Sequence, residues 1–183
     1  SVLMSVYKKE NPEYLRASLE SILVQTRTAD EILLIEDGPL TQELYQVVAE
    51  YQKKCDYLHV HAMEQNVQLG RALAKGVELC KYDLIARMDT DDIAMPDRLE
   101  KEEAYMEAHP EVDVVGGAIR EFNDEGTIDR VKNMPKTQEE ILEYVKVRNP
   151  LNHMTVMYRK DSILKAGNYK HFPFLEDYSL WSR

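Results

Sequence analysis

The sequence predicts an α/β domain in which a doubly wound, mostly parallel sheet is followed by a mixed second half. In the first half, short apolar runs alternate with segments of helical periodicity, which is typical of a parallel sheet with helices on both faces. The length of 183 residues suits one domain with a sizeable core. Its 44% hydrophobic and 31% charged residues are typical of a globular protein.

Four strands and three helices are predicted to alternate in the first half. The strands are expected at residues 2–7, 32–35, 58–62 and 84–88. Asn11 and Pro12 form a helix N-cap and first-turn pair, and apolar residues then recur at helical spacing up to Leu23. A second helix is expected over 41–54, and a third over the apolar positions from Leu69 to Cys80.

The second half is less regular. A helix is expected over 97–109, a strand over 112–122, a hairpin-type turn over 123–126 and a strand over 154–158. Thr137 and Glu140 form a capping box that opens a helix reaching about residue 146. Gly167 is expected to stop a short helix that begins near Lys160. Both ends interrupt a strand or helix pattern, so a fragment of a longer chain is expected.

The bulk properties exclude some functions. A formal net charge of −10 argues against a nucleic acid as partner, because such proteins usually carry a basic face. The chain has no apolar run long enough to span a membrane. Two isolated cysteines, Cys55 and Cys80, favour a reduced, cytoplasmic compartment.

An acidic cluster, Asp89 to Asp92, directly follows the fourth predicted strand. In doubly wound sheets ligands bind beyond the carboxyl ends of the strands, where Tyr7 and Asp37 are also expected. Mg²⁺ takes one or two carboxylates and completes its shell with phosphate oxygens and water, which suits this spacing. A solvated acidic turn is the plain alternative, and a phosphatase with an aspartyl nucleophile also places Asp-x-Asp after an apolar strand.

Ordered motifs along nearly the whole chain resemble the family-two glycosyltransferases. The motifs are Ser5-Val6-Tyr7, Glu36-Asp37-Gly38, Asn66, Arg87-Met88-Asp89-Thr90-Asp91-Asp92 and Pro96-x-Arg98. Those that look like the bacterial exopolysaccharide and amylovoran-type branch are Val114-Val115-Gly116-Gly117, Arg148-Asn149-Pro150-x-Asn152-His153 and Glu176-Asp177-Tyr178-x-Leu180-Trp181.

The resemblance implies a GT-A fold that binds a nucleoside-diphosphate sugar, with residues 1–92 as the nucleotide-binding half and 93–183 as the half for acceptor and catalytic base. Asp37 would contact the base, uracil by analogy, in a pocket that Tyr7 also lines. Asp89 would lie near the ribose or diphosphate, and Asp91 would coordinate Mn²⁺ or Mg²⁺. Asp177 matches the family's catalytic base, with its neighbour Glu176 as the weaker candidate, although acidic residues are also favoured at any helix N-terminus.

One stretch departs from the family pattern. Val67-Gln68 stands where a glycine is expected, and Ala74 where an asparagine is common. Arg71 could pair with the base or the diphosphate, or could be a solvated helix arginine. The departure puts the edge of the donor pocket in doubt.

The resemblance therefore implies a metal-dependent, inverting hexosyltransferase in bacterial cell-surface polysaccharide synthesis. A saccharide or lipid-linked saccharide would be its acceptor, in the cytoplasm and at the inner face of the membrane through regions outside this sequence. Two alternatives stay open: the phosphatase, with Asp89 as nucleophile, and a non-catalytic domain that binds sugar nucleotides.

Overall fold

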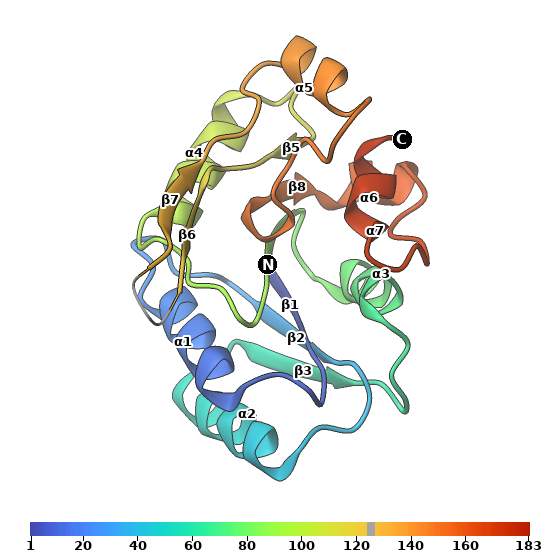
Figure 1. The fold of residues 1–183 in the computed structure, drawn as a ribbon. Helices are drawn as coiled ribbons and strands as arrows, with labels where there is room; N and C mark the ends of the chain where they lie inside the picture. Colours follow the sequence, from blue (N-terminus) through green and yellow to red (C-terminus); the bar gives the residue numbers. More distant parts are fainter. Residues whose placement is uncertain (124–126) are drawn as a thin grey trace.

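The computed structural model describes residues 1–123 and 127–183, whose main sheet has six strands in the order β3-β2-β1-β4-β8-β5 (Figure 1). These strands are β1 (Val2–Val6), β2 (Ile32–Glu36), β3 (Leu58–Ala62), β4 (Leu84–Met88), β5 (Val114–Val115) and β8 (Met157–Arg159). The helices are α1 (Pro12–Leu23), α2 (Gln42–Lys54), α3 (Leu69–Leu79), α4 (Arg98–Ala108), α5 (Gln138–Tyr144), α6 (Lys160–Lys165) and α7 (Glu176–Trp181).

The sheet is parallel in its first half and antiparallel at one side. β1 pairs with β2 and β4, and β2 with β3, all in parallel. β8 runs antiparallel to both β4 and β5. The predicted doubly wound sheet with a mixed second half is therefore confirmed.

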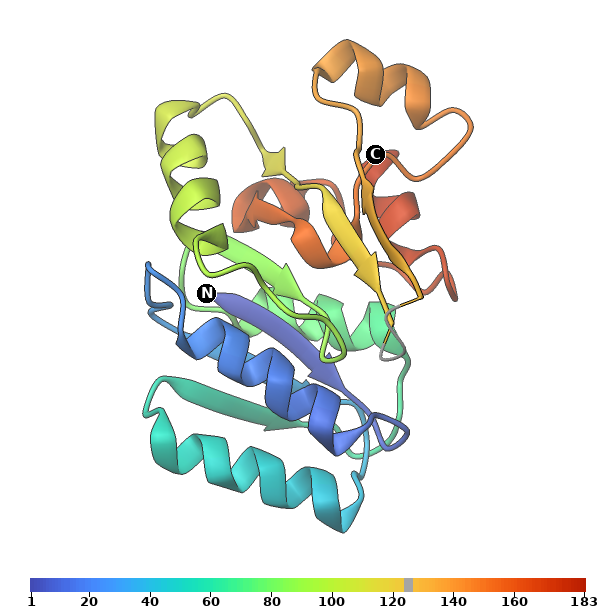
Figure 2. The ribbon, with the colours of Figure 1, turned by 60° about the vertical axis from the view of Figure 1, so that its left-hand side comes forward.

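Helices cover both faces of the sheet and enclose two hydrophobic cores. On one face, alternate residues of β1 such as Val2 and Met4 pack with α1, α2 and α4. On the other, Leu3 packs with α3, α6 and α7. Figure 2 shows α1 and α2 together on one side of the sheet, with α3 behind it. The two-residue period of the strands thus sends successive side chains into opposite cores.

The expected helix starts are present. The side chain of Asn11 accepts a hydrogen bond from the backbone N–H of Glu13, with Pro12 in the first turn of α1. Thr137 and Glu140 make both hydrogen bonds of the capping box at the start of α5. These local signals set the element boundaries without help from the rest of the fold.

Two expected strands of the second half are wrong in extent. The run 112–122 is broken at 116–118, where the backbone of Gly117 bonds to the side chains of Thr155 and Asn152. β5 joins the main sheet, while β6 (Ile119–Phe122) pairs with an unexpected strand, β7 (Asp129–Lys132), in a separate two-stranded sheet. The expected strand at 154–158 starts only at Met157, after a 3₁₀ turn, His153–Thr155. Residues 124–126 of the expected hairpin turn lie outside the described residues.

Among the described residues, no helix has both the length and the apolar composition that crossing a bilayer requires.

Candidate active site

A cleft of about 680 Å³ opens where β1, β2 and β4 end; we call it the β4 cleft. Four of the predicted site residues line it: Tyr7, Asp37, Asp89 and Asp91. β1 lies between β2 and β4, so this is where the strand order reverses, the usual ligand position in doubly wound sheets. The topology therefore brings together side chains that are up to 84 residues apart in sequence.

Asp37 is buried and braces the loop that precedes α3. Its carboxylate accepts hydrogen bonds from the side-chain amide of Asn66 at 2.9 Å and the backbone N–H of Val67 at 2.6 Å. Burial raises the pKa of Asp37, and hydrogen bonds from the backbone N–H groups of Val67 and Gln68 oppose that rise. Asp37 therefore fixes one wall of the β4 cleft.

Gln68 explains how the chain accommodates the missing glycine of the family pattern. Its φ of 72° lies in the left-handed region, which is costly for a residue with a side chain. Gln68 lines the β4 cleft directly before α3, next to the hydrogen bonds that Asp37 makes. The loop keeps a glycine-type backbone and adds an amide side chain to the cleft wall.

Asp89 is held from two sides. Its backbone carbonyl accepts a hydrogen bond from the hydroxyl of Ser18 on α1, at 2.8 Å. Its Oδ1 lies 2.6 Å from Nη2 of Arg87, a side chain with no exposed surface. The side chain of Asp89 is 27% exposed, so it lies at the boundary between the protein interior and the cleft.

The other acidic residues of the cluster have different surroundings. Asp91 is exposed on the β4 cleft. Asp92 does not line the β4 cleft. Its pKa is raised to about 6 by burial and by the charges of Asp89 and Asp91, which Arg87 and Arg98 partly offset. Three carboxylates in four residues thus repel one another, a repulsion that a cation would relieve.

The donor set fits a hard divalent cation. Asp89 and Asp91 line one cleft with carboxylate oxygens, the ligands that Mg²⁺ and Mn²⁺ prefer. No group of three or more His, Cys, Asp or Glu residues in the described part of the chain is arranged to hold a metal by itself. Such a pair of carboxylates therefore suits a cation that completes its shell with phosphate oxygens and water.

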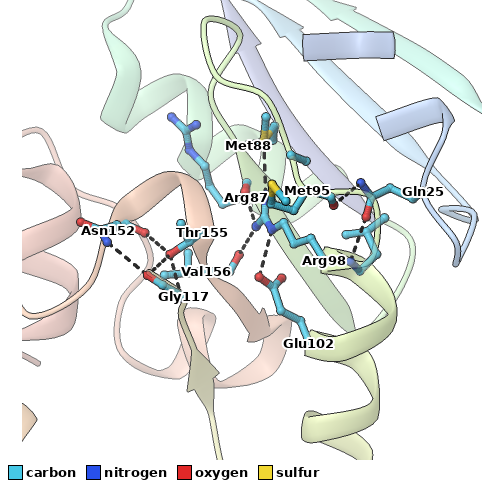
Figure 3. Close-up of polar contacts among 12 residues, drawn as sticks. Gln25, Arg87, Met88, Met95, Arg98, Glu102, Gly117, Asn152, Thr155 and Val156 are labelled. Atoms are coloured by element: carbon cyan, nitrogen blue, oxygen red, sulfur yellow. Dashed lines mark hydrogen bonds and ion pairs between the residues drawn. The ribbon is translucent and has the colours of Figure 1, made fainter. Parts of the chain in front are cut away.

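Arg98 secures the end of β4 from the other core (Figure 3). Its guanidinium donates a 2.8 Å hydrogen bond to the carbonyl of Arg87 and pairs with Glu102 at 2.9 Å. Burial raises the pKa of Glu102, and the charge of Arg98 opposes that rise. Arg98 and Glu102 thereby fix the strand end from which the acidic cluster projects.

A second cleft, of about 920 Å³, lies between α4 and the β6–β7 sheet; we call it the α4 cleft. Asp92, Glu102, Tyr105 and Phe122 are among its lining residues. Its cations Arg98, Lys101 and Arg120 are all engaged in ion pairs with acidic side chains. The α4 cleft therefore offers aromatic surface and carboxylate acceptors, but no unpaired cation among these three.

Two predicted site residues do not line the β4 cleft. Arg71 is exposed on α3. Asp177, on α7, is half-buried, and its Oδ2 accepts a 2.5 Å hydrogen bond from the side-chain amide of Asn149. Glu176, which the sequence made the weaker candidate, is buried and lines the cleft instead.

Gly70 explains how Glu176 reaches the cleft. A Cβ at position 70 would lie 2.6 Å from the carbonyl of Lys170 and 3.2 Å from Cβ of Glu176. The glycine thus allows α3 to approach the segment that leads into α7. The sequence shows a glycine at the start of a helix, but it does not show that Lys170 and Glu176 pack against that glycine.

The fold and the acidic cleft define a domain of the GT-A class, the nucleotide-diphospho-sugar transferase fold. Staphylococcus aureus TarS 1–349 in complex with UDP-GlcNAc superposes with a TM-score of 0.76 at 18% identity, over 98% of this chain and 51% of that one. The mannosyltransferase PcManGT from Pyrobaculum calidifontis, in complex with GDP-Man and Mn²⁺, gives a TM-score of 0.68 at 13% identity, over 92% of this chain and 46% of that one. The predicted GT-A fold is confirmed.

The chain belongs to glycosyl transferase family 2, whose pattern matches residues 1–170. It is 45% identical to the amylovoran biosynthesis glycosyltransferase AmsE of Erwinia amylovora, over 100% of this chain and 68% of the relative. It is 35% identical to the UDP-Gal:alpha-D-GlcNAc-diphosphoundecaprenol beta-1,3-galactosyltransferase of Escherichia coli, over 99% of this chain and 66% of the relative. The predicted family and its exopolysaccharide branch are confirmed, and the chain spans about two thirds of these relatives' length.

Proposed function

We propose that this chain is the catalytic domain of an inverting glycosyltransferase. It transfers a hexose from a UDP-linked donor to a hydroxyl of a saccharide or lipid-linked saccharide during synthesis of a bacterial surface polysaccharide. The observation that carries the proposal is the β4 cleft, in which Asp37, Asp89 and Asp91 gather at the reversal point of the sheet. The names of the two relatives above support the reaction and the polysaccharide setting.

Different residues of the β4 cleft suit different parts of the donor. Asp37, braced by Asn66, and the ring of Tyr7 suit the nucleobase, since both line the end of the cleft beside β1 and β2. Asp89 suits a ribose hydroxyl, because its backbone and one carboxylate oxygen are already fixed. Arg71 is exposed and would act on the diphosphate only from outside the cleft.

Asp91 would hold Mn²⁺ or Mg²⁺ against the donor diphosphate. When bound, the cation stabilises the negative charge that develops on the departing diphosphate and orients the donor. Support comes from the exposed carboxylate of Asp91 on the cleft and from the Mn²⁺ in the PcManGT complex.

Asp177 is proposed as the base that takes the proton of the acceptor hydroxyl as that oxygen attacks the anomeric carbon. A positioned base contributes about 10²- to 10⁴-fold to such a step. Asn149 binds one oxygen of Asp177 and would orient the carboxylate. Glu176 is the rival, because it lines the β4 cleft while Asp177 does not.

The α4 cleft is the proposed acceptor side. Carboxylates and aromatic rings suit hydroxyl groups and the apolar faces of sugar rings. Asp92 lines the α4 cleft and Asp91 the β4 cleft, so the acidic cluster borders both. A lipid-linked acceptor would place the protein in the cytoplasm, at the inner face of the membrane.

The test separates the two carboxylates of α7. In a transfer assay with UDP-sugars and Mn²⁺, Asp177→Asn should lower kcat by about 10²-fold or more, with UDP affinity unchanged. Glu176→Gln should raise KM for the donor and leave kcat within a few-fold. Loss of kcat in Glu176→Gln with normal turnover in Asp177→Asn would transfer the role of base to Glu176. Wild-type protein that binds sugar nucleotides without turnover would favour the non-catalytic alternative.

A further inference from the structure

Arg87 is a fully buried cation that stands two residues before the acidic cluster. It is the fourth residue of β4, and the alternation of the strand directs it to the same core as Ile85, which packs with α3 and α6. Its side chain extends away from Arg98 and Glu102 in Figure 3. The side chain has no exposed surface.

The guanidinium is poorly satisfied. Its ion-pair contact is Oδ1 of Asp89, 2.6 Å from Nη2. Burial lowers the pKa of Arg87, but the charges of Asp89 and Tyr169 and a hydrogen bond with Asp89 raise it overall. Nε and Nη1 have no hydrogen-bond partner among the described residues. Buried polar groups in native proteins are almost always hydrogen-bonded, so each exception needs an explanation.

Stability does not supply that explanation. Removing a guanidinium from water is costly, and replacing a buried ion pair by well-packed apolar side chains is often neutral or stabilising. An apolar side chain of similar length would suit this position, because residue 87 lies on the same face of β4 as the buried Ile85. Stability alone therefore does not account for a charge at this position.

We propose that Arg87 is a positioning residue for donor binding. Its fixed charge beneath the acidic cluster holds Oδ1 of Asp89 and directs the second oxygen into the β4 cleft, where it accepts a hydrogen bond from a hydroxyl of the donor nucleoside. Ser18 fixes the backbone of the same residue from α1, so Asp89 is preorganised from both cores. The inference rests on the proposed binding of a nucleoside diphosphate in this cleft.

The test is a double-mutant cycle read by calorimetric titration with UDP and Mn²⁺, together with thermal unfolding, on the complete protein. Arg87→Met should weaken UDP binding by about tenfold or more, the loss expected for a misdirected charged hydrogen bond, with Tm equal to or above the wild-type value. Arg87→Lys keeps the charge and should recover part of the affinity. The double variant Arg87→Met with Asp89→Asn should bind UDP no more weakly than Asp89→Asn alone.

Arg159 provides a matched control. It is a partly buried arginine at the end of β8 whose guanidinium donates hydrogen bonds to the backbone carbonyls of Met106, His109 and Val112. Arg159→Met should therefore lower Tm and leave UDP affinity unchanged. The positioning role would be overturned if Arg87→Met lowered Tm without changing UDP affinity, or if the variant could not fold. It would also be overturned if the losses of UDP binding free energy in Arg87→Met and Asp89→Asn added in full in the double variant. Wild-type protein that does not bind UDP at all would instead contradict the proposed function.

Discussion

Replacing Asp92 by asparagine is expected to stabilise the metal-free protein above pH 6 and to leave it unchanged near pH 4. The pKa of Asp92 rises from 3.8 to about 6, first through burial and then through Asp89 and Asp91. Between these two values the folded protein binds more protons than the unfolded chain. Its free energy of unfolding therefore falls as pH rises through this window, and the loss is complete above about pH 6.

The size of the effect follows from that shift. A rise of about two units corresponds to about 3 kcal/mol for a fully enclosed group. Asp92 is part-exposed, so solvent screening reduces the expected effect to about 1 kcal/mol. For a chain of this length, that is a rise in Tm of about 3 °C in Asp92→Asn at pH 8.

Denaturant unfolding in EDTA at pH 4, 6 and 8 measures this difference. Asp97→Asn is the opposite-sign control, because the hydrogen bond from Lys101 lowers the pKa of Asp97. The pair of Asp97 with Lys101 stabilises the fold above pH 4 and is lost on acidification. The Asp97→Asn variant should therefore not be more stable than wild type at pH 8. Mn²⁺ should reduce the gain in Asp92→Asn, because the cation relieves the same repulsion. An Asp92→Asn variant that is no more stable than wild type at pH 8, or equally more stable at pH 4, would refute this reasoning.

Three further predictions concern residues in and around the proposed site. Gly38→Ala should lower the free energy of unfolding by about 1–3 kcal/mol, measured by denaturant unfolding, because Gly38 has a φ of +82° and a Cβ there would lie 2.5 Å from the backbone nitrogen of Asn66. Asn149→Ala should lower kcat in the transfer assay by about tenfold without changing UDP affinity, because it frees Asp177; an unchanged kcat would separate Asn149 from the base. Asp37→Ala should raise Kd for UDP by calorimetry, and equal affinity in this variant would remove Asp37 from the nucleobase pocket.

The first half of the fold could be predicted because its signals are local. Apolar runs such as 84–88 stand between helix caps, and parallel pairing follows from the alternation of strands and helices. The break at 116–118 could not be predicted, because it depends on hydrogen bonds between Gly117 and the side chains of Thr155 and Asn152, more than 30 residues away.

The residues of the site also differ in whether local sequence signals could place them. Asp37, Asp89 and Asp91 could be placed because each follows a predicted strand, and carboxyl ends of parallel strands meet at one edge. Glu176 was underestimated, because which of two neighbouring acids faces a cleft depends on how α7 docks against Gly70. Arg87 belongs to a motif of the family resemblance, but the motif does not reveal that this charge within a strand is fully buried.

The dependence of UDP affinity on Mn²⁺ tests the central claim most directly. Calorimetric titrations of wild type and Asp91→Ala across a range of Mn²⁺ concentrations should show affinity rising to a plateau in wild type and staying flat in the variant. UDP that binds wild type equally well in EDTA, or an Asp91→Ala variant that keeps the full response to Mn²⁺, would contradict a cation held at the end of β4.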